Sequence, residues 1–201
     1  MTDSVKYREL VESLLSSRQE SLSAGLSGLT DRAQDLAMCA NTLVETLRSG
    51  HKVLVAGNGG SAAEAQHFAA ELVGRFLRER APLPAISLTA DSATVTALAN
   101  DYGYENMFAR QVEALGQSGD LLVAFSTSGE SDNLIRAASV ARKRGMRIVT
   151  VTGAQESSLS RLADHPLLMP AGETPVVQEL HMLVTHLLCE LAEEELSAES
   201  A

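Results

Sequence analysis

Cationic side chains are scarce in this sequence. Its 201 residues contain 16 Lys and Arg against 26 Asp and Glu, which gives a formal net charge of −10. A protein that binds a nucleic-acid backbone broadly needs clustered Lys and Arg, so no nucleic-acid partner is expected. The deficit leaves room for a small anionic ligand, because a local loop can hold a phosphate with backbone dipoles.

Cysteine and long apolar runs are scarce too. The two cysteines, Cys39 and Cys189, lie far apart in apolar helical contexts and are expected to be buried, reduced thiols. No apolar run approaches the roughly 20 residues of a membrane-spanning helix. Residues 1–9 include charged side chains and lack the apolar core of a signal peptide. We therefore expect a cytoplasmic protein that does not associate with membranes.

The chain has the length and composition of one globular domain, with 45% hydrophobic and 21% charged residues. Residues 3–49 predict two helices, separated by the glycines of 25–28, with a new helix start at Thr30 and Asp31. From residue 52, short β-rich apolar runs alternate with helical stretches. These runs lie at 52–56, 85–88, 120–125, 147–151 and, more briefly, 165–169.

Repeated strand–loop–helix units predict parallel strands joined by crossover helices. We expect one α/β domain over 1–201, with a helical segment at 3–49, an α/β core at 52–170 and a C-terminal helix at 174–194. The acidic tail from Glu193 onward is expected to fray. Apolar helices at both termini exceed what one sheet face needs, which indicates burial against another subunit.

A glycine-rich loop after the first predicted strand is the most informative feature. Asn58, Gly59, Gly60 and Ser61 connect this strand directly to a helix. Glycine permits positive φ and lets a ligand approach the backbone. The helix that follows offers free N–H groups and its positive dipole end, which suits an anion.

A second polar loop follows the strand at 120–125. It places the hydroxyls of Ser126, Thr127, Ser128 and Ser131 before another helix. Such hydroxyls either bind an anion or simply cap the turn. Two such loops at the carboxyl edge of one parallel sheet favour a phosphate site. The lysine of a P-loop is missing, so nucleotide hydrolysis is not indicated.

Two helices carry further polar side chains. His67 and Glu71 are four residues apart on one helix face, as a surface pair or as a proton-transfer or metal site. Gln178 and His186 are eight residues apart, about 80° around their helix, and can flank one pocket. His181 is expected to be structural or to lie between subunits.

Two other features leave alternatives open. Asn100 and Asp101 form either a common turn or part of a site. Arg75 can pair with Glu71, or reach a substrate phosphate or another subunit.

Together these motifs resemble the sugar isomerase (SIS) family and, within it, the phosphoheptose isomerases. The resemblance covers roughly 30–192 and rests on 56–61, 66–72, 100–103, 126–129 and 178–181, in order and at similar spacing. It implies a flavodoxin-like three-layer α/β/α sandwich with a five-stranded parallel sheet and extra helices at both termini. It also implies a homotetramer with active sites between subunits.

The resemblance further implies conversion of sedoheptulose 7-phosphate to D-glycero-D-manno-heptose 7-phosphate through an enediol, with Glu71 as base and His186 as acid. The residues matching the substrate site are Asn58, Gly59, Gly60, Ser61, Glu71, Asn100, Asp101, Ser126, Thr127, Ser128, Ser131 and Gln178. Some members bind one zinc ion per site through residues that match His67, Glu71, Gln178 and His186. No nucleotide cofactor is implied.

Two departures from the family pattern bear on specificity. Val176 stands where close relatives usually have Arg, and the turn after Gly153 lacks a Gly-Gly form. Both are expected near the substrate, so another long-chain sugar phosphate is an alternative substrate. A second alternative is a non-catalytic phosphosugar-binding adaptor similar to DiaA, which acts through a protein partner. Such relatives lack the pair that matches Glu71 and His186.

Overall fold

The computed structural model describes residues 3–170 and 172–197 and has five parallel strands in the order β2-β1-β3-β4-β5. This is the flavodoxin-like order, with its switch point between β1 and β3. The strands are β1 (Val53–Gly57), β2 (Ala85–Ser87), β3 (Leu121–Ser126), β4 (Arg147–Thr152) and β5 (His165–Leu168). All five predicted strands are therefore present within a residue or two of their expected bounds.

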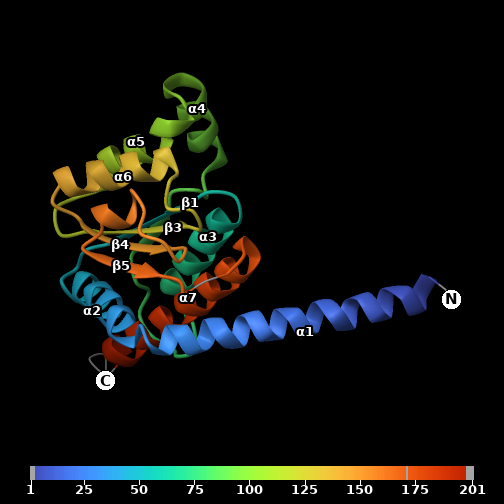
Figure 1. Cartoon of the computed structure of the whole chain (residues 1–201). Coiled ribbons are helices and arrows are strands. Elements are labelled where there is room, and N and C mark those ends of the chain that lie inside the picture. The colour runs from blue at the N-terminus through green and yellow to red at the C-terminus, as the bar shows by residue number, and fades with distance from the viewer. Residues whose placement is uncertain (1–2, 171, 198–201) are drawn as a thin grey trace.

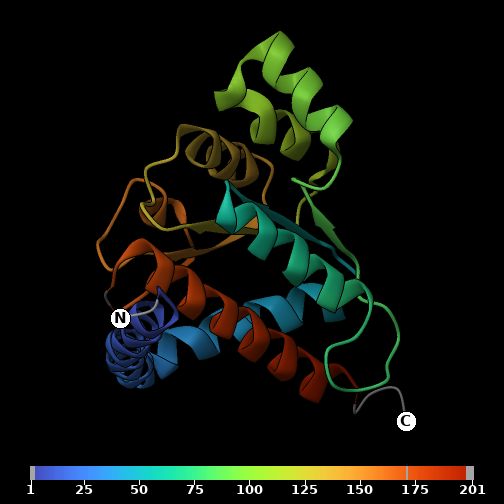
Figure 2. The same cartoon turned by 90° about the vertical axis from the view of Figure 1, so that its right-hand side faces the viewer.

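Helices cover both faces of this sheet, which confirms the three-layer prediction (Figures 1 and 2). They are α1 (Asp3–Thr30), α2 (Ala33–Arg48), α3 (Gly60–Val73), α4 (Ser92–Tyr102), α5 (Met107–Leu115), α6 (Asp132–Lys143) and α7 (Thr174–Ser197). Short 3-10 turns lie at Tyr104–Asn106 and Ser160–Leu162. Helix α5 is additional to the elements expected from the sequence.

Successive side chains of each strand enter different cores, because a strand alternates between its two faces. Val53 and Val55 pack with α2, α3 and α7, whereas Leu54 and Ala56 pack with α5 and α6. Both faces are apolar, so the strands read as continuous apolar runs instead of an alternating pattern.

The expected helix break at Gly25 and Gly28 is wrong, because both glycines lie inside α1. A Cβ on Gly25 would lie 2.8 Å from Leu180 Cδ1, and one on Gly28 would lie 2.4 Å from Pro170 Cβ. The glycines therefore allow close packing against α7 and the segment before it. The N-terminal half of α1 extends away from the sandwich (Figure 1).

The expected fraying from Glu193 is also wrong at that residue. Helix α7 continues to Ser197, and Glu193 is 1% exposed. Its carboxylate binds three backbone N–H groups of the segment after α3, which explains why an acidic residue is buried there. The last residues of the expected tail, 198–201, lie outside the described residues.

Both cysteines are free and buried, as expected. Burial raises the pKa of Cys39 and that of Cys189 to about 12, with further contributions from Asp35 to the first and from Glu71 and Glu193 to the second. Within 3–170 and 172–197, no helix is both long and apolar enough to cross a membrane.

Candidate active site

Two loops form one polar edge, because the strands before them are neighbours in the sheet. Gly57 of β1 is in register with Phe125 of β3, so the chain leaves both strands at the same level. A Cβ on Gly57 would lie 2.2 Å from the Ser61 carbonyl oxygen, and Gly59 has φ +57°. Only glycine fits this tight entry into α3 without rearrangement.

Asn58 ties the two loops together. Its side-chain amide exchanges hydrogen bonds of 2.9 Å with the amide of Asn133 on α6, and Tyr104 donates its hydroxyl to Asn58 Oδ1 at 2.9 Å. Neither Asn133 nor Tyr104 was expected from the sequence. Asn133 is 2% exposed, and its place at the expected start of the helix after the serine loop was the available signal for it.

The hydroxyls of the second loop partly serve the loop itself. Ser126 Oγ accepts a hydrogen bond from Gly129 N at 3.0 Å, and Ser128 Oγ accepts one from Glu130 N at 3.2 Å. Each hydroxyl still keeps its own proton to donate to an anion. Ser131 is the N-cap of α6 but makes no side-chain capping hydrogen bond. The loop is thus a capped turn that retains donors at its open side.

A second polar cluster lies between α3 and α7. His67 Nε2 is 3.0 Å from His186 Nε2 and 3.5 Å from Glu71 Oε1. The two imidazole rings meet edge to face, and the Phe76 ring stacks on His186 with ring centroids 5.1 Å apart and planes 23° apart. Three of the residues expected from the sequence are therefore brought together, and Phe76 is an unexpected neighbour.

A groove of about 550 Å³ lies between α3 and α7, from Gly60 of the glycine loop to His67 of the second cluster. Its lining includes Gly60 at the phosphate-loop end, His67 at the other end, and Gln178 and Met182 from α7. A Cβ on Gly60 would lie 2.2 Å from Gln178 Nε2, so Gln178 lies beside the glycine loop, and the prediction that it flanks one pocket with His186 stays untested.

Beneath the groove, His181 and Glu64 form a buried pair. His181 Nδ1 lies 3.2 Å from Glu64 Oε2, and the His181 side chain is fully buried. Of the two roles expected for His181, this burial is that of a structural residue within one subunit. Glu64 was not expected from the sequence.

Comparison with known proteins places this arrangement in a family. Residues 19–153 match the model of the SIS domain. The phosphoheptose isomerase of Aliarcobacter butzleri (strain RM4018) is 49% identical over 82% of this chain and 87% of its own length. That of Rhodospirillum rubrum is 48% identical over 84% of this chain and 89% of its own. The chain belongs to the SIS domain family.

Solved structures agree with this membership. The phosphoheptose isomerase of Neisseria gonorrhoeae superposes with a TM-score of 0.84 and 36% identity, covering 92% of this chain and 99% of that one. The enzyme of Francisella tularensis gives a TM-score of 0.86 and 37% identity, covering 92% and 98%. The predicted SIS fold is therefore confirmed.

One SIS chain by itself does not bring every expected residue together. Glu71 is 11 residues after Gly60 on α3, which corresponds to about 16 Å along the helix axis. Asn100 and Asp101 hydrogen-bond to each other at the exposed end of α4, which stands apart from α7 (Figures 1 and 2). A role for this pair in the site stays a prediction.

Contacts place two further residues. Arg75 pairs with Glu79 at 3.6 Å, and its reach to a substrate phosphate or another subunit stays a prediction. Val176 is 3% exposed and packs in the core beside Gly172, so its side chain does not face the groove, and its place near the substrate stays a prediction. An apolar side chain is stable in that position without facing a ligand.

Proposed function

We propose that this protein is a phosphoheptose isomerase, which converts sedoheptulose 7-phosphate to D-glycero-D-manno-heptose 7-phosphate. The observation that carries the proposal is the cluster of His67, Glu71 and His186 on the facing helices α3 and α7, the first of which starts at the glycine loop. Proteins named for this activity are 49% and 48% identical to this chain over 82% and 84% of its length.

The proposed chemistry moves a proton between C1 and C2 of the sugar. The Glu71 side chain is 22% exposed to solvent. Its carboxylate would remove the C1 proton to give a cis-enediol. His186 would transfer protons to and from the C1 and C2 oxygens, and Glu71 would return its proton to C2. The neighbouring His67 nitrogen gives His186 a partner with which to exchange a proton.

The polar edge would hold the phosphate. Ser61, Ser126, Thr127, Ser128 and Ser131 supply hydroxyls, and the start of α3 supplies backbone N–H groups near Asn58 and Gly59. No lysine or arginine is required at such a site, because helix N-termini and backbone donors suit an anion. Binding energy from this remote phosphate would hold the reacting carbons in place.

A zinc ion fits the donor types of the second cluster. Two imidazole nitrogens and a carboxylate are donors that zinc accepts, whereas the expected fourth donor, Gln178, lies beside Gly60 in this chain. Ligand nitrogens of a tetrahedral zinc lie roughly 3.3 Å apart, close to the 3.0 Å between His67 and His186. Among the described residues, no group of three His, Cys, Asp or Glu is already gathered for a metal. The ion would polarise the substrate carbonyl when bound.

We also propose a homotetramer with active sites completed by neighbouring subunits. Six C–C bonds of about 1.5 Å give a seven-carbon chain a contour length of at most about 9 Å. This is shorter than the distance along α3 from Gly60 to Glu71, so the phosphate site and the base acting on one substrate would come from different subunits. The projecting part of α1 also exposes large apolar side chains, namely Val5, Tyr7, Leu10, Val11, Leu14 and Leu15. Such a patch is typical of a protein interface. Free thiols are in keeping with a cytoplasmic location.

The decisive test is NMR of the purified protein with sedoheptulose 7-phosphate in D2O, with and without a chelator and added zinc. The proposal expects heptose 7-phosphate, or deuterium exchange at C1, and loss of both in Glu71→Gln. Activity only with a different long-chain ketose phosphate would change the assigned substrate. Failure with every phosphosugar tested would overturn the enzyme and favour the adaptor.

A further inference from the structure

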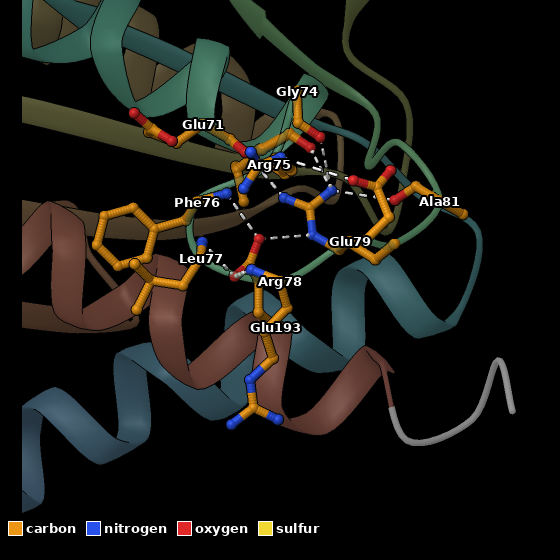
Figure 3. A network of polar contacts seen from close by, with 11 residues as sticks. Glu71, Gly74, Arg75, Phe76, Leu77, Arg78, Glu79, Ala81 and Glu193 are labelled. Atoms are coloured by element: carbon orange, nitrogen blue, oxygen red, sulfur yellow. Dashed lines mark hydrogen bonds and ion pairs between the residues drawn. The ribbon is translucent and has the colours of Figure 1, made fainter.

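Glu193 is a charged residue in an unusual position. It lies near the end of α7 with 1% exposure, and its carboxylate accepts hydrogen bonds from the backbone N–H groups of Phe76, Leu77 and Arg78 at 2.7, 2.8 and 2.9 Å (Figure 3). Burial would raise the pKa of this carboxyl, but these N–H groups and the Arg80 charge outweigh burial, so the pKa lies below its ordinary value.

Arg80 completes the network from the other side. Its Nε lies 3.1 Å from Glu193 Oε1, within ion-pair distance, although its N–H is not aligned as a hydrogen bond. Its Nη1 and Nη2 donate to four carbonyl oxygens, those of Leu72, Gly74, Ala81 and Glu71, at 3.0, 3.3, 3.0 and 2.8 Å. Arg80 thereby satisfies carbonyl groups that the end of α3 leaves without helical partners.

The segment fixed by this pair, residues 74–81, bridges the two proposed catalytic groups. It begins directly after the turn of α3 that carries Glu71, and it places the Phe76 ring against the imidazole of His186. Glu193 is seven residues after His186 on α7, so both lie on one face of the same helix. One rigid helix therefore carries the acid and the anchor of the segment that packs on it.

Stability alone is a weak account of this pair. A buried ion pair is often no more stabilising than apolar residues of similar volume, because both charges lose their hydration. Glu193 and Arg80 are each 2% exposed in their side chains, and between them they contact backbone groups at seven positions. Such directional contacts select one conformation of the segment.

We propose that Glu193, together with Arg80, is a positioning residue of the isomerase: it fixes residues 74–81 so that Phe76 holds the His186 ring and the end of α3 holds Glu71. This inference rests on the proposed roles of Glu71 and His186. Neither Glu193 nor Arg80 touches the substrate groove between α3 and α7.

The first test reads the His186 ring without any substrate. Protein labelled at histidine ¹³Cε1 is compared by NMR as wild type, Glu193→Gln and Phe76→Leu, with the His186 signal assigned by His186→Gln. Stacking on Phe76 shifts this signal by its ring current. We expect Phe76→Leu to remove the shift and Glu193→Gln to reduce it. An unchanged signal in Glu193→Gln would overturn the proposal.

The second test separates positioning from simple stability. In Glu193→Gln we expect kcat to fall on the order of 10- to 100-fold with KM little changed, since a small misplacement of a catalytic group can cost about 100-fold. The matched control is Glu194→Gln, the next residue on α7, whose exposed carboxylate pairs with Arg78. We expect wild-type kinetics from the control. A lowered Tm with unchanged kcat in Glu193→Gln would also overturn the proposal.

The third test measures the energetic coupling between Phe76 and Glu193 in a double mutant, with a substitute variant should one of them fail to fold. Phe76→Leu leaves the ion pair intact, and its effect on kcat should not add to that of Glu193→Gln, because both act through the same ring. If the two effects on kcat were fully additive, Glu193 would not act through the Phe76 ring, and the proposal would be contradicted. If Glu193→Gln does not fold, Arg80→Lys replaces it, since lysine cannot bridge four carbonyl groups. An inactive wild type would refute the proposed function, whereas the NMR comparison would still decide the positioning.

Discussion

His67 on α3 and His186 on α7 face each other through their Nε2 atoms, which are 3.0 Å apart. At this distance one nitrogen donates a proton and the other accepts it, or both nitrogens bind a common cation. Glu71 is 3.5 Å from the same His67 nitrogen. The Glu71 carboxylate and the His186 imidazole therefore converge on one His67 nitrogen, which sets the two groups proposed as base and acid side by side.

Replacing His186 tests the acid directly. We expect His186→Ala to lower kcat/KM by at least about 100-fold, the lower range for an acid–base group. The measurement is the rate of aldose phosphate formation, with circular dichroism to show that α7 remains folded. His181→Ala is unsuitable as a control because His181 is buried, whereas His51→Ala alters a half-exposed ring outside the groove. Near-normal turnover in His186→Ala would refute its role.

The serine loop should act on binding more than on chemistry. We expect Ser126→Ala with Ser128→Ala to raise KM for the phosphosugar, with a smaller effect on kcat, because these hydroxyls are assigned to the phosphate. Part of the effect will come from the loop itself, since both oxygens accept backbone N–H groups. Ser27→Ala, on the exposed face of α1, is the control. An unchanged KM would remove this loop from the phosphate site.

Sequence patterns predicted the sheet well because parallel strands are short apolar runs followed by polar turns. The glycine loop and the serine loop were placed correctly, since each directly follows such a strand. Contacts made far along the chain were harder to predict. The pairing of Asn58 with Asn133 joins positions 75 residues apart, and that of Glu193 with the segment after α3 joins positions more than 100 apart.

The interpretation of small and acidic residues failed for a related reason. Gly25 and Gly28 are typical of a helix end, but here they leave space for Leu180 and Pro170. Glu193 is typical of a solvated tail, but here backbone donors surround it. In each case a contact with a distant segment outweighs the local conformational preference of the residue. The neighbouring sequence does not reveal such a contact.

Acid should destabilise the fold through Asp120. Burial would raise its pKa, but hydrogen bonds from the Lys52 side chain and backbone and from Gln117 N outweigh this, so the pKa is lowered. A carboxyl with a lowered folded-state pKa stabilises the fold above its unfolded value, about 3.9, and this contribution is lost as pH falls through the folded value. We expect the Tm of Asp120→Asn to fall less than that of the wild type when the pH is lowered from about 6 to about 3. Parallel Tm curves would contradict this assignment.

Gly28 offers a test of the packing between α1 and the segment before α7. In an exposed helix interior, Gly→Ala gains about 1 kcal/mol. At Gly28 the new methyl group would lie 2.4 Å from Pro170 Cβ and 2.9 Å from Pro170 Cγ, and a proline ring cannot rotate away. We expect Gly28→Ala to lower the free energy of unfolding by about 1–3 kcal/mol, the usual cost of overpacking. Gly25→Ala should cost less, because its nearest neighbour is the end of the Leu180 side chain, which can change rotamer. Urea denaturation of both variants beside Ser27→Ala measures the difference, and equal stability of Gly25→Ala and Gly28→Ala would show that Pro170 yields as easily as Leu180.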